Sequence, residues 1–329
     1  MLGFDSKTQV VHFDHRHDHP GYILIRTIDK GFQSQTTLVR SLQDGNVYIR
    51  KHLNANENSG AELLVRNLPT DVAPRLIDYT NTLDRNQNDD VFIYEYCNGG
   101  DLADLHTKYL NHHTKIRFLP GALLWDIARQ CAEKIAYIHS GWQYGQGVQV
   151  GWEPFIHGDI SPSNTFLDWN SDSSPYPQVL LGDWRIARTF KEPKGRDMAS
   201  WREYQSIDLQ CFLELLVSID NEAQIRTPDV QNPTPSQLFE DIGAEGEKWE
   251  LRPENKGSSI AAYIADKFIE KARTRIRDFE SQEASGDLRW TMPNAVIGFA
   301  TFDKNGPPPT IKQPWEWRNL DQLPIGFGA

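Results

Sequence analysis

The 329-residue sequence lacks the features that mark several specialised protein classes. It contains only three cysteines, Cys97, Cys131 and Cys211, and they are scattered and odd in number. This pattern indicates neither a disulfide framework nor a zinc-binding spacing. No apolar run approaches the roughly 20 residues that a membrane-spanning helix requires. Basic residues are also in deficit, because 34 Lys and Arg stand against 45 Asp and Glu, for a formal net charge of -11.

These deficits exclude some functions and leave others open. A dedicated binder of nucleic acid or of anionic membranes needs clustered Lys and Arg, so the acidic balance speaks against both partners. The first residues have no basic segment followed by an apolar one, as a signal peptide would. A composition of 39% hydrophobic and 24% charged residues is ordinary for a globular protein. We therefore expect a soluble intracellular protein, cytoplasmic or nuclear, with one large domain or two lobes.

The first 20 residues are a polar extension with four histidines and two aspartates between His12 and His19. Histidine and aspartate are common ligands of transition metals. Ligands crowded together without a flanking fold are a weak pattern, however. An exposed polar lead-in segment is the plainer interpretation, and a metal site is the alternative.

Residues 22–96 have the pattern of a small β-sheet with one helix. A hairpin signal, Asp44-Gly45-Asn46, separates two of the runs. Residues 61–68 predict a short helix that ends before Pro69. The turn at residues 29–35 contains only Gly31, so a plain hairpin turn fits better than a phosphate-binding loop. The five predicted strands cover residues 22–25, 37–39, 47–51, 72–79 and 91–96.

Helical patterns dominate after the Gly99-Gly100 pair, which frees the backbone and suits a hinge between lobes. Asp101 can cap a helix that runs to residue 110. We read residues 226–256 as a polar connection and residues 306–329 as a surface tail containing proline and tryptophan. Further helices are predicted over residues 123–140, 205–219 and 258–282.

The chemistry is concentrated in two short segments. Asp159 and Asn164 lie five positions apart on a predicted tight loop between two apolar runs, and Asp183 follows the strand-like residues 179–181. Magnesium prefers a few carboxylate or amide oxygens together with phosphate oxygens and water. A further carboxylate can orient an attacking hydroxyl. The two segments therefore predict a magnesium-dependent phosphoryl-transfer site.

The order of these motifs resembles the protein kinase superfamily from about residue 21 to about residue 220. The resemblance implies an α+β, bilobal protein kinase-like fold. Residues 21–97 would be a small N-lobe with a five-stranded antiparallel sheet and one helix, and residues 98–300 a mainly helical C-lobe with divergent C-terminal helices. Residues 1–20 and 301–329 would flank this domain.

The resemblance also implies roles for residues of the expected N-lobe. Lys51 would contact the α- and β-phosphates of ATP, with Arg50 as the competing candidate, and Glu62 would be the ion-pair partner of the lysine. Gly31 would lie in a degraded glycine-rich loop over the phosphates. The hinge backbone at Glu95 and Cys97 would receive the adenine.

In the expected C-lobe, residues 157–164 match the catalytic-loop pattern H-x-D-x-x-x-x-N. By this resemblance, Asp159 accepts the proton of the substrate hydroxyl, while Asn164 and Asp183 hold Mg²⁺. His157 would brace the loop rather than take part in chemistry.

Several positions depart from the family pattern. Gly158 replaces an arginine that normally pairs with a phosphorylated activation loop, so such switching is not expected. Ser161 replaces a lysine that steadies the γ-phosphate, and Arg185 replaces the glycine that follows Asp183-Trp184. The segment after Asp183 is short and contains no Ala-Pro-Glu, which weakens the case for a peptide platform.

Three functions follow. The favoured one is an ATP- and Mg²⁺-dependent kinase that binds a nucleotide and phosphorylates Ser or Thr hydroxyls of a protein substrate. A pseudokinase scaffold that binds a protein partner is the alternative, since the glycine loop is eroded, Ser161 and Arg185 depart from the family pattern and the peptide platform is missing. A small-molecule kinase resembling aminoglycoside or choline kinases is the third.

Overall fold

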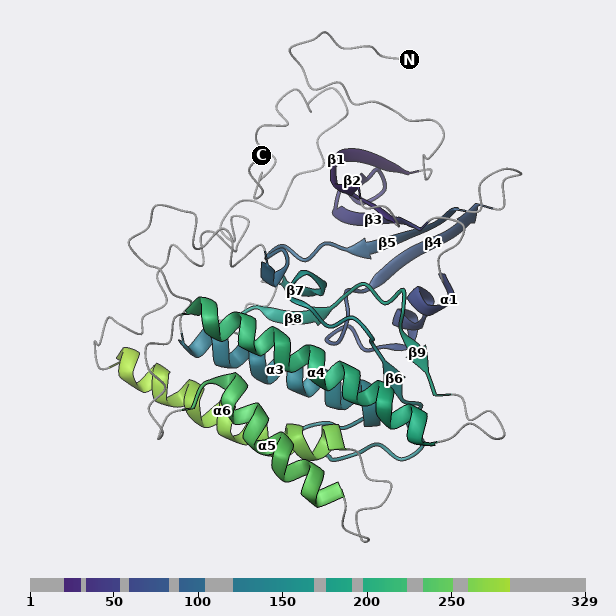
Figure 1. The fold of residues 1–329 in the computed structure, drawn as a ribbon. Helices are drawn as coiled ribbons and strands as arrows, with labels where there is room; N and C mark the ends of the chain where they lie inside the picture. The colour runs from purple at the N-terminus through teal and green to yellow at the C-terminus, as the bar shows by residue number, and fades with distance from the viewer. Residues whose placement is uncertain are drawn as a thin grey trace, which may run out of the picture. The chain divides into compact units, whose positions relative to one another are not determined.

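The structure, a computed structural model, describes residues 21–30, 34–53, 59–82, 89–103, 121–168, 176–190, 198–223, 233–250 and 260–284 (Figure 1). The predicted N-terminal extension, Gly31, most of the helix after Asp101 and the C-terminal tail lie outside these residues. The chain divides into two compact units, Met1–Asn98 with Thr301–Ala329, and Gly99–Ala300. None of the helices described is long and apolar enough to cross a membrane.

The first unit contains a five-stranded antiparallel sheet with strand order β1-β2-β3-β5-β4. This sheet agrees with the strands that the sequence predicts. The strands are longer than their apolar cores because flanking polar residues continue the ladder. Their bounds are β1 Tyr22–Lys30, β2 Ser34–Ser41, β3 Val47–Leu53, β4 Leu76–Thr82 and β5 Asp89–Glu95.

Local turn chemistry sets the ends of these strands. The predicted hairpin joins β2 to β3, with Gly45 at a φ of 74° and the Ser41 N–H donating to the Asn46 carbonyl at 2.9 Å. Strand β4 begins at Leu76, four residues later than predicted, and Pro74 provides a reason because it has no N–H for a ladder. The predicted helix is a short α1, Ser59–Glu62, followed by a 3₁₀ turn η1, Leu63–Asn67.

The second unit is mainly helical and contains two small two-stranded sheets. One sheet pairs β6 with β9 and the other pairs β7 with β8. The 3₁₀ turn η2, Pro162–Asn164, precedes β7. The strand bounds are β6 Phe155–Ile156, β7 Thr165–Asp168, β8 Gln178–Leu181 and β9 Arg188–Thr189. The helices are α3 Gly121–Ser140, α4 Met198–Ala223, α5 Pro235–Glu250 and α6 Ile260–Ala284.

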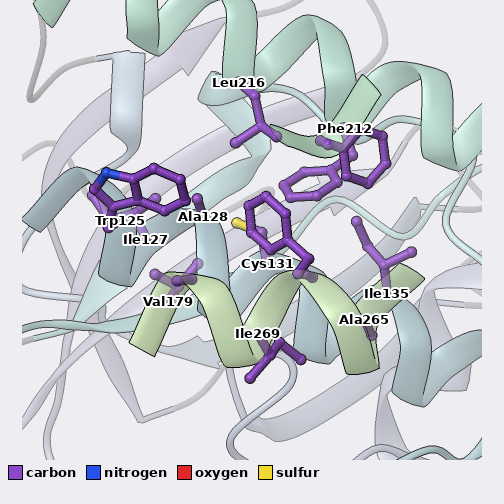
Figure 2. Packing of buried hydrophobic residues seen from close by; sticks show 14 of the residues in the cluster. Trp125, Ile127, Ala128, Cys131, Ile135, Val179, Phe212, Leu216, Ala265 and Ile269 are labelled. Carbon is purple, nitrogen blue, oxygen red and sulfur yellow. The ribbon is translucent and has the colours of Figure 1, made fainter. Parts of the chain in front are cut away.

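Helix α3 is the centre of the second unit and is buried over most of its length. Apolar residues at three- and four-residue spacing, such as Ile127, Cys131 and Ile135, face the core formed with α4 and α6 (Figure 2). The helix ends where Gly141 takes a left-handed φ of 65° and donates its N–H to the Tyr137 carbonyl. The predicted span of this helix, residues 123–140, is thus nearly the observed one.

The interpretation of residues 226–256 as a polar connection is wrong over Pro235–Glu250, where α5 lies. This helix has a capping box: the Thr234 hydroxyl accepts the Gln237 N–H at 3.4 Å, and the side-chain Oε1 of Gln237 accepts the Thr234 N–H at 3.1 Å. Pro235 occupies the first helical position, where its missing N–H costs nothing. The apolar residues Leu238, Phe239 and Ile242 then bury against the core.

Candidate functional site

In the first unit, Lys51 and Glu62 form a buried ion pair. The Lys51 Nζ lies 2.9 Å from Glu62 Oε1, and the two side chains are only 10% and 2% exposed. The same carboxylate oxygen accepts a 2.7 Å hydrogen bond from the Tyr94 hydroxyl, a contact that the motifs did not indicate. Neighbouring strand residues point to opposite faces of a sheet, and Arg50 donates to Thr37 Oγ1 at 3.2 Å. The lysine, and not the arginine, therefore has the predicted partner.

The other predicted nucleotide-binding positions are less defined. Glu95 ends β5, and its N–H donates to the Arg75 carbonyl at 2.9 Å, so the backbone group that it could offer to an adenine is its own carbonyl. Cys97 lies two residues further along the chain and is buried. Gly31 lies outside the described residues.

In the second unit, the loop between β6 and β7 brings Asp159 and Asn164 together. The Asn164 Nδ2 donates to both the carbonyl and the Oδ2 of Asp159, each at 2.9 Å. A 3₁₀ turn, closed by the Asn164 N–H on the Ser161 carbonyl, holds the asparagine in place. Because the amide nitrogen is used in this way, Oδ1 of Asn164 is the atom that can serve as a metal ligand.

His157 is fully buried and links this loop to the segment after β8. Its Nε2 lies 2.9 Å from the Gly182 carbonyl, and its Nδ1 lies 3.2 Å from the Asp159 N–H. A carbonyl only accepts, and a backbone N–H only donates, so the ring is the neutral tautomer with its proton on Nε2. Burial lowers the pKa of His157, in agreement with a neutral ring. The predicted bracing role of His157 matches these contacts.

Asp208, on α4, anchors the same loop and was not among the predicted site residues. Its Oδ2 accepts the His157 N–H at 2.8 Å and lies 2.9 Å from His139 Nε2, while its Oδ1 accepts the Gly158 N–H at 2.7 Å. Burial acts to raise the pKa of this carboxyl, but hydrogen bonds and charge, first from His139, hold the pKa below its usual value. The loop that carries Asp159 thus rests on one buried carboxylate.

Asp183 is the only non-glycine residue among those described with a positive φ, at 60°. A left-handed backbone at such a residue is uncommon and typically accompanies a functional constraint. The preceding Gly182 donates its N–H to the Asn164 carbonyl at 2.9 Å, which ties the segment to the loop. The following Trp184 is buried, and its Nε1 donates to the Leu181 carbonyl at 2.8 Å.

The donor atoms in this unit fit a magnesium–nucleotide complex. Asp183 offers a carboxylate and Asn164 an amide oxygen, which are the hard oxygen ligands that Mg²⁺ takes alongside phosphate and water. Within the described ranges, no group of three or more His, Cys, Asp or Glu side chains is arranged to hold a metal alone. Asp159 lies on the same loop and is hydrogen-bonded to Asn164.

Comparisons with known proteins point in the same direction. The serine/threonine-protein kinase Nek2 of Homo sapiens is 29% identical over 174 residues, which is 51% of this chain and 35% of that protein. The probable serine/threonine-protein kinase nek2 of Dictyostelium discoideum is 26% identical over 180 residues, or 52% of this chain and 38% of that protein. The serine/threonine-protein kinase ATG1a of Arabidopsis thaliana is 35% identical over 98 residues, which is 30% of this chain and 12% of that protein.

The first two matches thus span little more than a third of the relatives' own length. No protein-family model matches the chain. The matching relatives are serine/threonine kinases. The chain contains a protein kinase-like domain.

Proposed function

We propose that the protein is an ATP- and Mg²⁺-dependent phosphotransferase that acts on Ser or Thr hydroxyls of a protein substrate. Asp159 accepts the proton of the attacking hydroxyl while the new P–O bond forms and the bond to the departing ADP breaks. Lys51 positions the nucleotide phosphates, and Asp183 with Asn164 Oδ1 would hold the metal. Bound Mg²⁺ neutralises charge on the phosphates. The proposal is supported by similarity to serine/threonine kinases.

The observation that carries the proposal is the fixed position of Asp159. Its backbone N–H is held by His157 Nδ1, its carbonyl and carboxylate are held by Asn164, and the residues before it are held by Asp208. A base held by this many contacts needs little reorganisation before proton transfer, which is how positioned groups lower a barrier. The departures at Gly158 and Ser161 leave these contacts intact.

Transfer from labelled ATP to generic Ser/Thr protein substrates tests this function. Asp159→Asn keeps the size of the side chain but removes the base, and we expect transfer to fall at least 100-fold, in line with general-base catalysis. Ser163→Ala, an exposed change on the same loop, is the matched control and should stay within twofold. Transfer that survives Asp159→Asn, or no transfer to proteins under any metal or pH condition, contradicts the proposal. A parallel panel of small-molecule alcohols tests the third alternative.

A pseudokinase is the second candidate, and a specific contact favours it. The Asp183 carboxylate, which would hold the metal, lies 3.5 Å from Arg185 Nε. A thermal-shift titration with ATP and Mg²⁺ separates the two functions, because a ligand at 100 times its Kd adds about 2.7 kcal/mol of stability. Stabilisation without turnover favours a pseudokinase that binds nucleotide, whereas stabilisation with turnover favours the kinase.

A further inference from the structure

Arg185 is built into a position beside Asp183. Arg185 lies within a turn that the Ala187 N–H closes on the Trp184 carbonyl at 2.9 Å, two residues after the left-handed backbone of Asp183. The buried indole of Trp184 fixes this turn. The Arg185 Nε then lies 3.5 Å from Asp183 Oδ2, with the two side chains 22% and 23% exposed.

The charge of Arg185 acts directly on any cation at Asp183. At 3.5 Å the guanidinium offsets part of the negative charge that the carboxylate presents, and it repels a divalent ion approaching the same oxygens. The limited exposure of both side chains reduces the solvent screening that makes fully exposed ion pairs weak.

We propose that Arg185 is a resident counter-ion of Asp183 that competes with divalent cations, so that this arginine sets the metal affinity of the site. The inference rests on the proposed role of Asp183 as a metal ligand, and it assigns regulation of that site to a side chain that moves off the carboxylate when metal binds. The protein would then take up a divalent ion weakly until another negative group, such as a nucleotide phosphate, accepts the guanidinium.

Mn²⁺ alone is a suitable probe, because its free concentration can be followed by electron paramagnetic resonance in a titration of the full chain. Arg185→Gln removes the charge and should tighten Mn²⁺ binding about 5- to 10-fold over the wild type. Arg185→Lys keeps the charge and should stay within about twofold. Arg188→Gln is the matched control: it removes the same charge three positions along, from a side chain that stacks on Tyr204 at 4.6 Å. It should also stay within about twofold.

Each result decides the question. The proposal holds if Arg185→Gln alone tightens binding and the added change Asp183→Asn abolishes that gain. It is overturned if Arg185→Gln and Arg188→Gln give the same gain, since net charge would then explain both, or if Arg185→Gln binds Mn²⁺ no better than the wild type. Circular dichroism of each variant verifies the fold. Phosphoryl transfer is not measured here, so a protein without kinase activity could still pass this test, and an active kinase could fail it.

Discussion

Replacing Asp208 with alanine should release the loop that carries Asp159. Alanine removes the acceptor of the His157 and Gly158 N–H groups and of the His139 ring, all of them buried or largely so. A buried N–H group left without a partner costs about 1–3 kcal/mol. Removing one partner from a buried charged network costs roughly 3–5 kcal/mol in all. We therefore expect the free energy of unfolding to fall by about 3–5 kcal/mol, a large share of the ~5–15 kcal/mol of a typical domain.

Two measurements check this expectation. Urea unfolding followed by tryptophan fluorescence and far-UV circular dichroism gives the change in total stability. Native-state hydrogen exchange reports on the two amides directly: protection at His157 and Gly158 should fall about 100-fold, which corresponds to ~2.8 kcal/mol of local stability. Asp208→Asn keeps one oxygen for a single backbone N–H and should lie between alanine and the wild type. It also keeps the test possible if the alanine variant does not fold.

Glu214→Ala is the matched control for these variants, because it removes an exposed carboxylate from the same helix. Its hydrogen bond to Gln210 is exposed, so its loss should change stability by no more than about 0.5 kcal/mol. The reasoning fails if Asp208→Ala destabilises the protein by less than about 1 kcal/mol. It fails equally if the amides of His157 and Gly158 keep their protection, since another acceptor would then hold the loop.

Three further changes test other parts of the structure. Lys51→Met leaves the buried Glu62 carboxylate without its cation and should lower the free energy of unfolding by about 3 kcal/mol. The double variant Lys51→Met, Glu62→Gln should regain at least half of this loss, as measured by urea unfolding. Burial lowers the pKa of His157, so below pH ~6.5 the unfolded chain binds a proton at this residue that the folded chain does not. The contribution of the neutral His157 to the free energy of unfolding is therefore fully present above pH ~6.5. Below that pH, the free energy of unfolding should fall by up to ~1.4 kcal/mol per pH unit. In urea unfolding between pH 7.5 and 5, His157→Gln should make the fall of stability with decreasing pH less steep. If the pH dependence is unchanged in this variant, groups other than His157 are responsible for it. Gly182→Ala would drive a Cβ into the phenylalanine ring of β7 and should lower the free energy of unfolding by about 1–3 kcal/mol, as measured by thermal unfolding. Gly243→Ala is the control: this residue lies in α5 with open space around it, so the change should be neutral or slightly stabilising.

Features that depend on neighbouring residues were predictable from the sequence. The hairpin at Gly45 needs only a short turn signal, and α3 has an apolar face at helical spacing with a glycine just beyond its end. Helix α5 also has a local signal: Thr234 and Gln237 form a capping box around Pro235, although polar residues surround this pattern. Local rules therefore account for most of the elements.

The anchor of the candidate site was not predictable by the same rules. Asp208 and His157 are 51 residues apart, and nothing near either residue specifies the other as its partner. One signal was present: Asp208 lies on the same helix face as the buried Phe212, Leu215 and Ile219, at positions where a charge is out of place. A lone acid on an apolar helix face indicates a buried partner, but only the tertiary structure identifies that partner as the backbone of the loop that carries Asp159.

The departures from the kinase pattern affect charge more than position, and this difference bears on activity. Gly158 has a φ of 82°, and a Cβ there would lie 3.3 Å from the Ile186 side chain, so the glycine suits the backbone that Asp208 holds. Ser161 removes a cation, while Arg185 places one on Asp183. A base in the correct position with weakened phosphate electrostatics should retain a slow reaction that still depends on Asp159, since positioning and charge stabilisation make separate contributions to the rate. We therefore expect low turnover that Asp159→Asn abolishes, rather than complete inactivity, and a wild-type rate equal to that of the Asp159→Asn variant would contradict this argument.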